Sequence, residues 1–269
     1  MYQLTNYKRG LLVSVIVFLL HLFRITNDKR LVLQVLFHYN YKEGSDFAFS
    51  MIQFSDYWFV IILPLLLSIP FLFTLEDALQ GGLWRMQVNR TGIRGYVFRS
   101  LLANLISSTS FIVLGYIMYV LLCYICLPQF SEVIDTTTQM PYIYANPLLN
   151  TTVELYGVFV RVCVFSGICL FMSSLCMLSM QLTHNKFRGV GIVMILNYLL
   201  DTLSGIMIVR SKFMDYRWCI LSPTELLMTS ENWFALFNTS FWWYWFGIFT
   251  VILLINLPCT YMLKRRIRH

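Results

Sequence analysis

Few side chains in this chain have the types and spacing that catalysis or metal binding requires. A zinc site or a histidine-based catalyst needs two or more histidines close together, whereas the four here are scattered over three regions: His21, His38, His184 and His269. The sequence also lacks the P-loop pattern, the G-x-S-x-G nucleophile elbow and the H-E-x-x-H zinc motif. We therefore expect no catalytic residue, no bound metal and no binding of ATP through a P-loop in this chain.

One cysteine pair has a spacing that occurs in redox and zinc sites. Cys123 and Cys126 form a C-x-x-C, which in a soluble protein would indicate thiol–disulfide chemistry or a pair of metal ligands. Here the pair lies inside a long apolar segment, where free cysteines commonly act as small packing residues. We therefore interpret both thiols as packing groups.

Two ionisable residues, Arg161 and Asp201, lie within apolar segments that are long enough to cross a membrane. From their distances to the ends of these segments, at 1.5 Å per residue, we place them at depths of roughly 8 and 12 Å. Charges in lipid are costly and often line a pathway, which makes Arg161, Asn197 and Asp201 candidate pathway residues. Alternatively, Arg161 extends outward to the interface and Asp201 faces a polar crevice with Asn197.

Six apolar stretches must position these groups, and together they indicate an all-α polytopic membrane protein. Hydrophobic residues make up 58% of the chain and charged residues 12%, which excludes a soluble domain. A helix needs about 20 apolar residues to cross a hydrocarbon core of about 30 Å. We predict one transmembrane domain, residues 1–269, with six spans at about 10–23, 57–75, 101–127, 156–182, 189–209 and 241–263.

Two spans and one connection have unusual features. The first span, of roughly 14 residues, covers only about 21 Å and needs the basic residues at both ends to extend to the interfaces. The second contains Pro64 and Pro70, which bend membrane helices. The semi-apolar connection at 210–240 predicts one or two short helices that dip back into the membrane before the last span.

The basic residues gather on every second connection between the spans. Twelve of the 20 Lys and Arg fall in four segments: the N-terminus, residues 76–100, residues 183–188 and the C-terminal tail. These segments hold only two acidic residues, Glu76 and Asp77. This is the positive-inside pattern, which predicts that both termini lie in the cytoplasm. The net charge of +7 then reflects topology and attraction to anionic membrane lipid, so we expect no nucleic-acid partner.

The loop at residues 76–100 differs from an ordinary basic loop. An acid pair is expected to end the second span, a double glycine breaks the chain, and a short apolar helix at Leu83–Val88 follows. Gly92 then suits a tight turn, and two arginines approach the lipid headgroups. The residues of this pattern are Glu76, Asp77, Gly81, Gly82, Leu83, Trp84, Arg85, Val88, Gly92, Arg94 and Arg99.

This arrangement resembles the membrane subunits of ABC exporters of the type-2 permease family. In that family the segment after the second span typically runs from an acid through glycine, a short apolar helix, Gly-(Ile/Val)-Ser-Arg and an aromatic residue to a lysine. Here those places hold Glu76, Gly81 or Gly82, Leu83–Val88, Gly92 and Ile93, Arg94, Tyr96 and Arg99. The chain departs from the family pattern in lacking the serine before Arg94, in having arginine for lysine at position 99, and in its double glycine.

The resemblance implies the transmembrane subunit of an ATP-driven exporter, which is not an enzyme in its own right and holds no cofactor. Two copies of a separate ABC-type ATP-binding subunit would carry ATP and Mg and would dock on residues 76–100, where the helix between spans two and three acts as a cytosolic coupling helix. A second permease chain, identical or related, would complete the substrate pathway. Small members of the family imply a peptide or antimicrobial compound as substrate and the cell membrane of a bacterium as the location.

Two other classes of function stay open at the level of sequence. The chain could be an intramembrane enzyme or lipid-modifying protein with Arg161 and Asp201 as its reactive pair. It could also be a non-catalytic membrane sensor or accessory subunit. Loss of an activity of the isolated chain on mutation of Asp201 would favour the enzyme, whereas association with a P-loop ATPase would favour the exporter.

Overall fold

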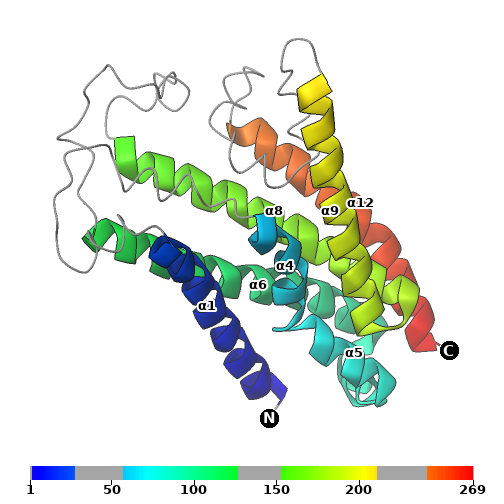
Figure 1. Ribbon diagram of the computed structural model, residues 1–269. Helices are drawn as coiled ribbons and strands as arrows, with labels where there is room; N and C mark the ends of the chain where they lie inside the picture. Colours follow the sequence, from blue (N-terminus) through cyan, green and yellow to red (C-terminus); the bar gives the residue numbers. More distant parts are fainter. Residues whose placement is uncertain (1, 28–56, 127–152, 211–240, 269) are drawn as a thin grey trace, which may run out of the picture.

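All regular secondary structure in the described part of the chain is helical (Figure 1). The computed structural model describes residues 2–27, 57–126, 153–210 and 241–268, and no strand occurs among them. The prediction of an all-α fold is confirmed for these residues. The helices are α1 (Tyr2–Asn27), α4 (Tyr57–Ser68), α5 (Leu72–Gln80), α6 (Trp84–Cys126), α8 (Val153–Thr183), α9 (Lys186–Arg210) and α12 (Phe241–Arg268).

Among the described residues, three helices are long and apolar enough to cross a membrane. The qualifying stretches are Trp84–Leu122 in α6, Phe165–Thr183 in α8 and Trp245–Ile267 in α12, and they overlap the third, fourth and sixth predicted spans. The bent pair Ile61–Ser68 and Leu72–Gln80 is a fourth candidate if it is counted as one span. These lengths and compositions are compatible with a membrane protein.

The first and fifth predicted spans lie within longer helices. α1 has 26 residues and α9 has 25. At 1.5 Å per residue α1 is about 39 Å long, so the chain is helical well beyond the apolar run at 10–23. The prediction counted apolar residues alone, whereas the helix continues through polar residues on both sides. The dipping helices predicted at 210–240 lie outside the described residues.

The second predicted span, at about 57–75, is interrupted in the region where its prolines were expected to bend it. α4 ends at Ser68, α5 begins at Leu72, and the two helices are bent by 53° at the break. Pro70 lies in the break, where its missing backbone N–H and the clash of its ring with the preceding turn favour an interruption of the helix. Ser68 Oγ donates to the Pro64 carbonyl at 2.7 Å, which stabilises the last turn of α4. The second half of the span then extends to Gln80.

α1 packs closely on α6 because small residues lie between the two helices. A Cβ atom added at Gly115 would lie 2.9 Å from Val17 Cβ, so only glycine permits this approach. Ser14 Oγ donates to the Phe111 carbonyl of α6 at 2.6 Å. Val13 and Val17 are fully buried in the same contact. The N-terminal helix is therefore an integral part of the bundle.

A buried polar cluster joins α6, α8 and α12 within the apolar core. Asn104 Nδ2 donates to the Ser173 carbonyl at 3.2 Å, and Ser108 Oγ donates to Asn104 Oδ1 at 3.2 Å. At the next residue of α8, Ser174 Oγ accepts from Asn256 Nδ2 at 3.2 Å. Interhelical bonds of this kind hold membrane helices together where apolar packing alone does not fix their register.

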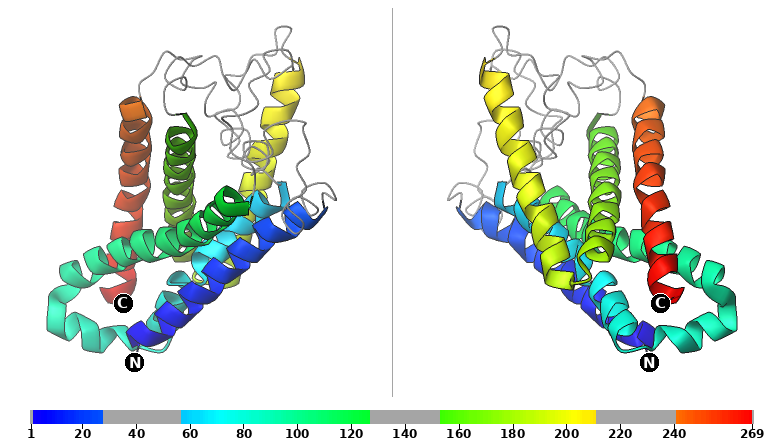
Figure 2. Two further views of the ribbon diagram at one scale, coloured as in Figure 1. Left: turned by 90° about the vertical axis from the view of Figure 1, so that its left-hand side faces the viewer. Right: turned by 90° about the vertical axis from the view of Figure 1, so that its right-hand side faces the viewer.

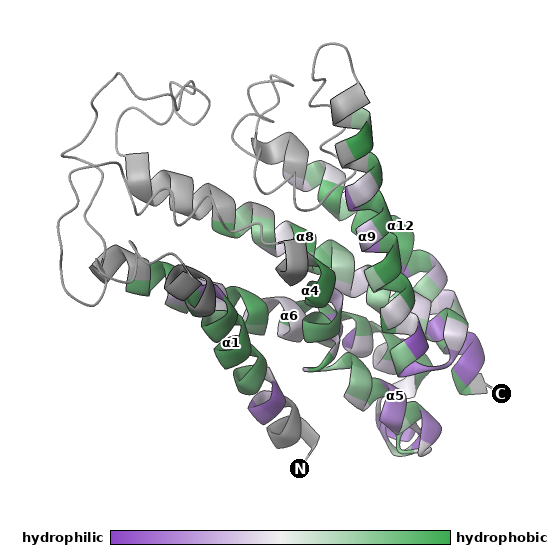
Figure 3. Ribbon diagram, in the orientation of Figure 1, coloured by the Kyte–Doolittle hydropathy of each residue, from purple (hydrophilic) through white to green (hydrophobic). Residues whose placement is uncertain are grey.

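The four segments that hold most of the basic residues gather at one end of the molecule. Figure 2 shows the start of α1, the end of α12, α5, the start of α6 and the α8–α9 turn at this end. In Figure 3 hydrophilic residues are concentrated around α5 and the end of α12, whereas the middle portions of the helices are mostly hydrophobic. We refer to this region as the basic end.

Candidate functional site

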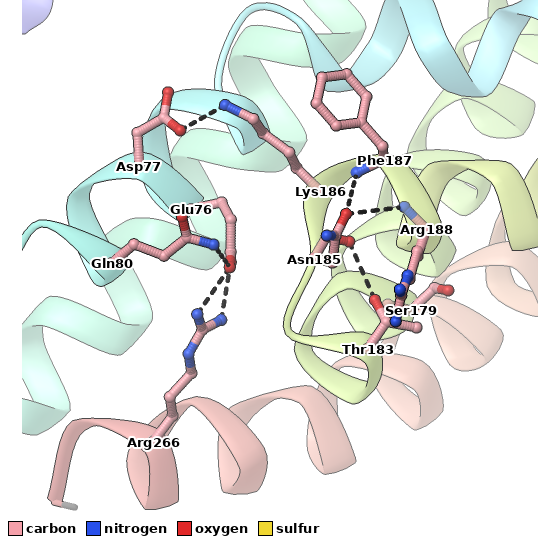
Figure 4. A network of polar contacts seen from close by, with 10 residues as sticks. All are labelled: Glu76, Asp77, Gln80, Ser179, Thr183, Asn185, Lys186, Phe187, Arg188 and Arg266. Carbon is pink, nitrogen blue, oxygen red and sulfur yellow. Dashed lines mark hydrogen bonds and ion pairs between the residues drawn. The ribbon is translucent and has the colours of Figure 1, made fainter.

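A buried ion pair at the basic end joins α5 to the last turns of α12 (Figure 4). Arg266 donates through Nη1 to Glu76 Oε2 at 2.8 Å and through Nη2 to Glu76 Oε1 at 2.7 Å. Gln80 Nε2 also donates to Oε1, at 3.0 Å. The Glu76 side chain has no exposed surface, and that of Arg266 is 17% exposed. Because a two-point guanidinium–carboxylate contact is directional, the pair fixes α5 relative to α12.

The sequence of α5 explains why this carboxylate is buried. Leu72, Leu75 and Leu79 are buried, and Glu76 lies among them at helical spacings of one, three and four residues. A buried carboxylate is costly unless it is paired and hydrogen-bonded, and Arg266 and Gln80 provide both. Glu76 was predicted to end the second span, whereas it lies in the middle of α5 and on its inward face.

Asp77 points to the other side of α5 and pairs with the start of α9. Its Oδ1 accepts from Lys186 Nζ at 2.5 Å, with the Asp77 side chain 49% exposed and that of Lys186 27% exposed. The Lys186 ammonium also lies 5.8 Å from the ring centroid of Phe73 and 5.7 Å from that of Phe187. The two adjacent acids of α5 are therefore bound to two different basic segments.

The α8–α9 turn that supplies Lys186 is itself well ordered by side-chain bonds. Asn185 Oδ1 accepts from the backbone N–H groups of Phe187 and Arg188 at 3.0 and 3.1 Å, which caps the start of α9. Thr183 Oγ1 donates to the Ser179 carbonyl at 2.9 Å. The cap fixes where α9 begins and hence where the Lys186 side chain starts.

Two glycines with left-handed backbone angles bound a short helical segment after α5. Gly82 has φ of 72°, and Gly92 has φ of 72° and ψ of 161°, which interrupts the helical geometry inside α6. Residues other than glycine rarely adopt these angles. Between the two glycines, residues 84–91 form about two helical turns that we call the linker helix. The linker helix overlaps the short helix predicted at Leu83–Val88, and Gly92, where a tight turn was predicted, interrupts the helical geometry of α6.

The linker helix has an inward and an outward face. Trp84 and Val88 are half-buried and pack against the core of the bundle. The outward face carries Arg85, Met86, Asn89 and Arg90, all exposed, with Met86 70% exposed. Leu83, just before the helix, is 51% exposed.

Beyond the kink, α6 continues with alternating basic and buried residues. Arg94 and Arg99 are exposed, whereas Tyr96 and Val97 are buried. An open pocket of about 460 Å³ lies beside the kink, lined by Thr91, Gly92, Ile93, Arg94, Gly95 and Lys264. The surface next to the linker helix is therefore concave and carries positive charge from both α6 and α12.

The candidate pathway residues lie on α8 and α9, away from the basic end. Asn197 is buried, and Asp201, one turn further along α9, is half-buried on the same side of the helix. Arg161 belongs to α8, but its side chain lies outside the described residues. The pairing of Arg161 with Asp201 stays a prediction.

Within the described residues, no three or more His, Cys, Asp or Glu side chains come together as a metal site would require. The side chains of Cys123 and Cys126 are not among the described ones. Cys169 and Cys176 on α8 are fully buried, as packing residues would be.

The functional residue that sequence reasoning missed is Arg266. It was grouped with the basic tail, whose charges were read only as an indicator of topology. The signal that could have found it is the position of Glu76: three leucines of α5 share its face, so this carboxylate needed a buried cation from another helix. Four basic residues in the last six positions offered candidates, but spacing alone does not choose among them.

Comparison with known proteins yields no relative for this chain: no protein-family model, no curated protein and no solved structure matches it. The class of protein is therefore defined by the structure itself. It is an all-helical protein, over the residues described, with several long apolar helices that are compatible with a membrane.

Proposed function

We propose that this chain is the transmembrane subunit of an ATP-driven exporter of the ABC type. The observation that carries the proposal is the linker helix: eight residues bounded by two glycines at φ of 72°, with an exposed basic outward face at the end of the molecule where both termini lie. An exposed helix mounted in this way on an apolar bundle is suited to contact a soluble subunit. The resemblance of residues 76–100 to the family pattern supports the same reading.

The ion pairs of α5 suggest how motion of the linker helix spreads through the bundle. A push on this helix acts on α6 directly and on α5 through the Gly81–Leu83 turn. Because Glu76 is bound to Arg266 of α12 and Asp77 to Lys186 of α9, displacement of α5 would also pull on α12 and α9. A bundle with two arrangements could then be biased by the nucleotide state of the soluble subunit.

The remaining features of the proposal follow from charge and from the family resemblance. The basic end faces the cytoplasm by the positive-inside rule, which places both termini and the linker helix there. Two copies of the ATP-binding subunit hold ATP and Mg, and a second permease chain, identical or related, completes the pathway. The location is the cell membrane of a bacterium, and the substrate is a peptide or antimicrobial compound.

The proposal is tested by purifying the tagged full chain from its native membranes in mild detergent. We expect an ATPase with a P-loop to co-purify, and we expect its association to be lost when residues 84–91 are replaced by a Gly-Ser linker of equal length. Membrane insertion of the variant is checked by its recovery in the membrane fraction. Transport by the purified chain stripped of partners, or failure of any ATPase to associate even after chemical cross-linking, would contradict the proposal.

An Asp201→Asn variant separates this function from the enzyme alternative. In the exporter, the variant keeps the associated ATPase, because Asp201 lies on α9 away from the basic end. An activity of the isolated chain that disappears with Asp201→Asn would instead identify an intramembrane enzyme.

A further inference from the structure

On the outward face of the linker helix, the apolar side chain of Met86 lies between the positive charges of Arg85 and Arg90. At 100° per residue, Met86 and Asn89 point opposite to Trp84 and Val88, and Arg85 and Arg90 flank them on either edge. The exposures agree with this geometry, since Trp84 and Val88 are half-buried while Met86 is 70% exposed. Methionine and arginine are both enriched at the centres of protein interfaces, whereas a solvated helix face favours lysine and glutamate.

The charge of this surface is not neutralised by acidic residues in the part of the chain that the structure describes. At the basic end, the acids among the described residues are Glu76 and Asp77, and these are bound to Arg266 and Lys186. The exposed arginines of the linker helix and of the start of α6 are left without an acidic neighbour in this part of the structure. Lys264 of α12 extends the positive surface across the adjoining pocket.

We infer that the soluble subunit which docks here presents an apolar socket for Met86 flanked by acidic side chains that pair with Arg85 and Arg90. This inference rests on the proposed function and adds the chemistry of the partner's docking surface. The pocket beside Gly92, lined by Arg94 and Lys264, receives a further acidic group of the same partner. Complementary charge of this kind accelerates encounter and fixes the orientation of docking.

The distribution of apolar side chains favours a protein partner over a lipid surface. A helix that lies on a membrane turns a continuous apolar stripe toward the acyl chains and its basic face toward headgroups and water. Here the apolar stripe, Trp84 and Val88, is already packed against the bundle. The outward face offers Met86 as its one large apolar side chain, which is enough for a socket but not for insertion into a bilayer.

The experiment compares co-purifying Mg-dependent ATPase activity among variants of the tagged full chain in native membranes. Arg85→Glu with Arg90→Glu is expected to lower the retained activity about tenfold or more, since reversal turns two attractive contacts into repulsive ones. Met86→Asp should have a similar effect, and Met86→Leu should restore binding to within about twofold. Lys8→Glu, an exposed basic residue of α1 at the same end, is the matched control and should change retention by less than about twofold.

Two further measurements keep the test decisive if a reversal variant is poorly folded. Arg85→Gln and Arg90→Gln singly should each lower the amount of ATPase retained at low salt. Each should also make retention less sensitive as salt is raised toward 1 M, where the screening length is about 3 Å, because one screened ion pair is lost. Replacing acidic residues of the identified ATPase by lysine should rescue the Arg85→Glu, Arg90→Glu chain. Rescue by such a charge swap requires direct pairing and does not follow from a structural defect.

The outcomes distinguish the inference from the proposed function. If an ATPase co-purifies but its binding does not change with salt or with charge reversal, the inference of an acidic socket is wrong and the proposed exporter function is kept. If no ATPase associates with the native chain, both fail. A lipid surface is tested with Met86→Cys in nanodiscs without any partner: protection from a water-soluble maleimide in phosphatidylglycerol but not in phosphatidylcholine would overturn the inference in favour of a membrane contact.

Discussion

Removing the Arg266 guanidinium would leave the Glu76 carboxylate fully buried, with the Gln80 amide still donating to its Oε1. Loss of one member of a buried ion pair typically costs about 3–5 kcal/mol, because the other charge stays desolvated. Arg266 is 17% exposed and Gln80 continues to donate, so the cost should fall toward the lower end. We expect Arg266→Met to lower the free energy of unfolding by about 3 kcal/mol.

The assay is reversible unfolding of the purified chain in mixed micelles, followed by tryptophan fluorescence as the fraction of denaturing detergent rises. Arg265→Met is the matched control, because Arg265 is an exposed neighbour on the same turn of α12 and should change stability by less than about 0.5 kcal/mol. The double variant Glu76→Leu, Arg266→Met should recover most of the loss, since an apolar pair can replace a buried ion pair at little cost.

A double-mutant cycle on these variants measures the coupling between Glu76 and Arg266. We expect a coupling energy of about 2 kcal/mol or more, as for contacting residues in one hydrogen-bonded group. If Arg266→Met is no worse than Arg265→Met, or if the effects of the two single changes simply add, then the buried pair does not hold α5 to α12 and the reasoning above fails.

Three further predictions concern neighbouring features. Asp77→Asn should lower stability by less than about 1 kcal/mol in the same assay, because its pair with Lys186 is solvent-exposed; a larger loss would mean that the pair is buried in the membrane-bound state. Gly92→Ala should lower the free energy of unfolding by about 1–2 kcal/mol, because the backbone at this position has a φ of 72°. Gly95→Ala is the control and should leave stability unchanged, because Gly95 lies in regular helix and an added Cβ would be 3.5 Å from the nearest side-chain atom. Equal effects of the two variants would exclude backbone strain as the cause. Asn104→Leu should lower the free energy of unfolding by about 1 kcal/mol, because it removes the buried bond from Asn104 to the Ser173 carbonyl of α8 and the bond from Ser108 within α6. An unchanged thermal unfolding midpoint would show that this polar cluster does not contribute to stability.

Apolar length and charge placement were enough to predict the helical class and most of the helix positions. The third, fourth and sixth predicted spans overlap helices that are long and apolar enough to cross a membrane. The sequence also located the glycine turn, because a left-handed backbone angle has few alternatives to glycine and Gly92 stood between two helical patterns.

Two features of the structure, the break after α4 and the burial of Glu76, depend on contacts between helices, which the spacing of apolar residues in the sequence does not show. The break at Ser68–Leu72 was expected only as a bend, because a proline can be accommodated in a kinked helix or can end one, and neighbouring helices decide which. The family resemblance assigned Glu76 to the region that docks a partner, so the burial of its carboxylate was not predicted. Its burial follows from the bend, which turns α5 so that its leucine face meets the bundle and carries Glu76 with it.

The most direct measurement of docking is photo-cross-linking from single positions of the linker helix in native membranes. A photoreactive amino acid at Met86 or at Arg90 is predicted to cross-link the chain to a P-loop ATPase, in a yield that changes when ATP is added. The same amino acid at Val88, which packs against the bundle, is predicted to give no such product. Equal cross-linking from Met86 and Val88, or cross-linking of Met86 to lipid alone, would contradict docking of an ATPase on this helix.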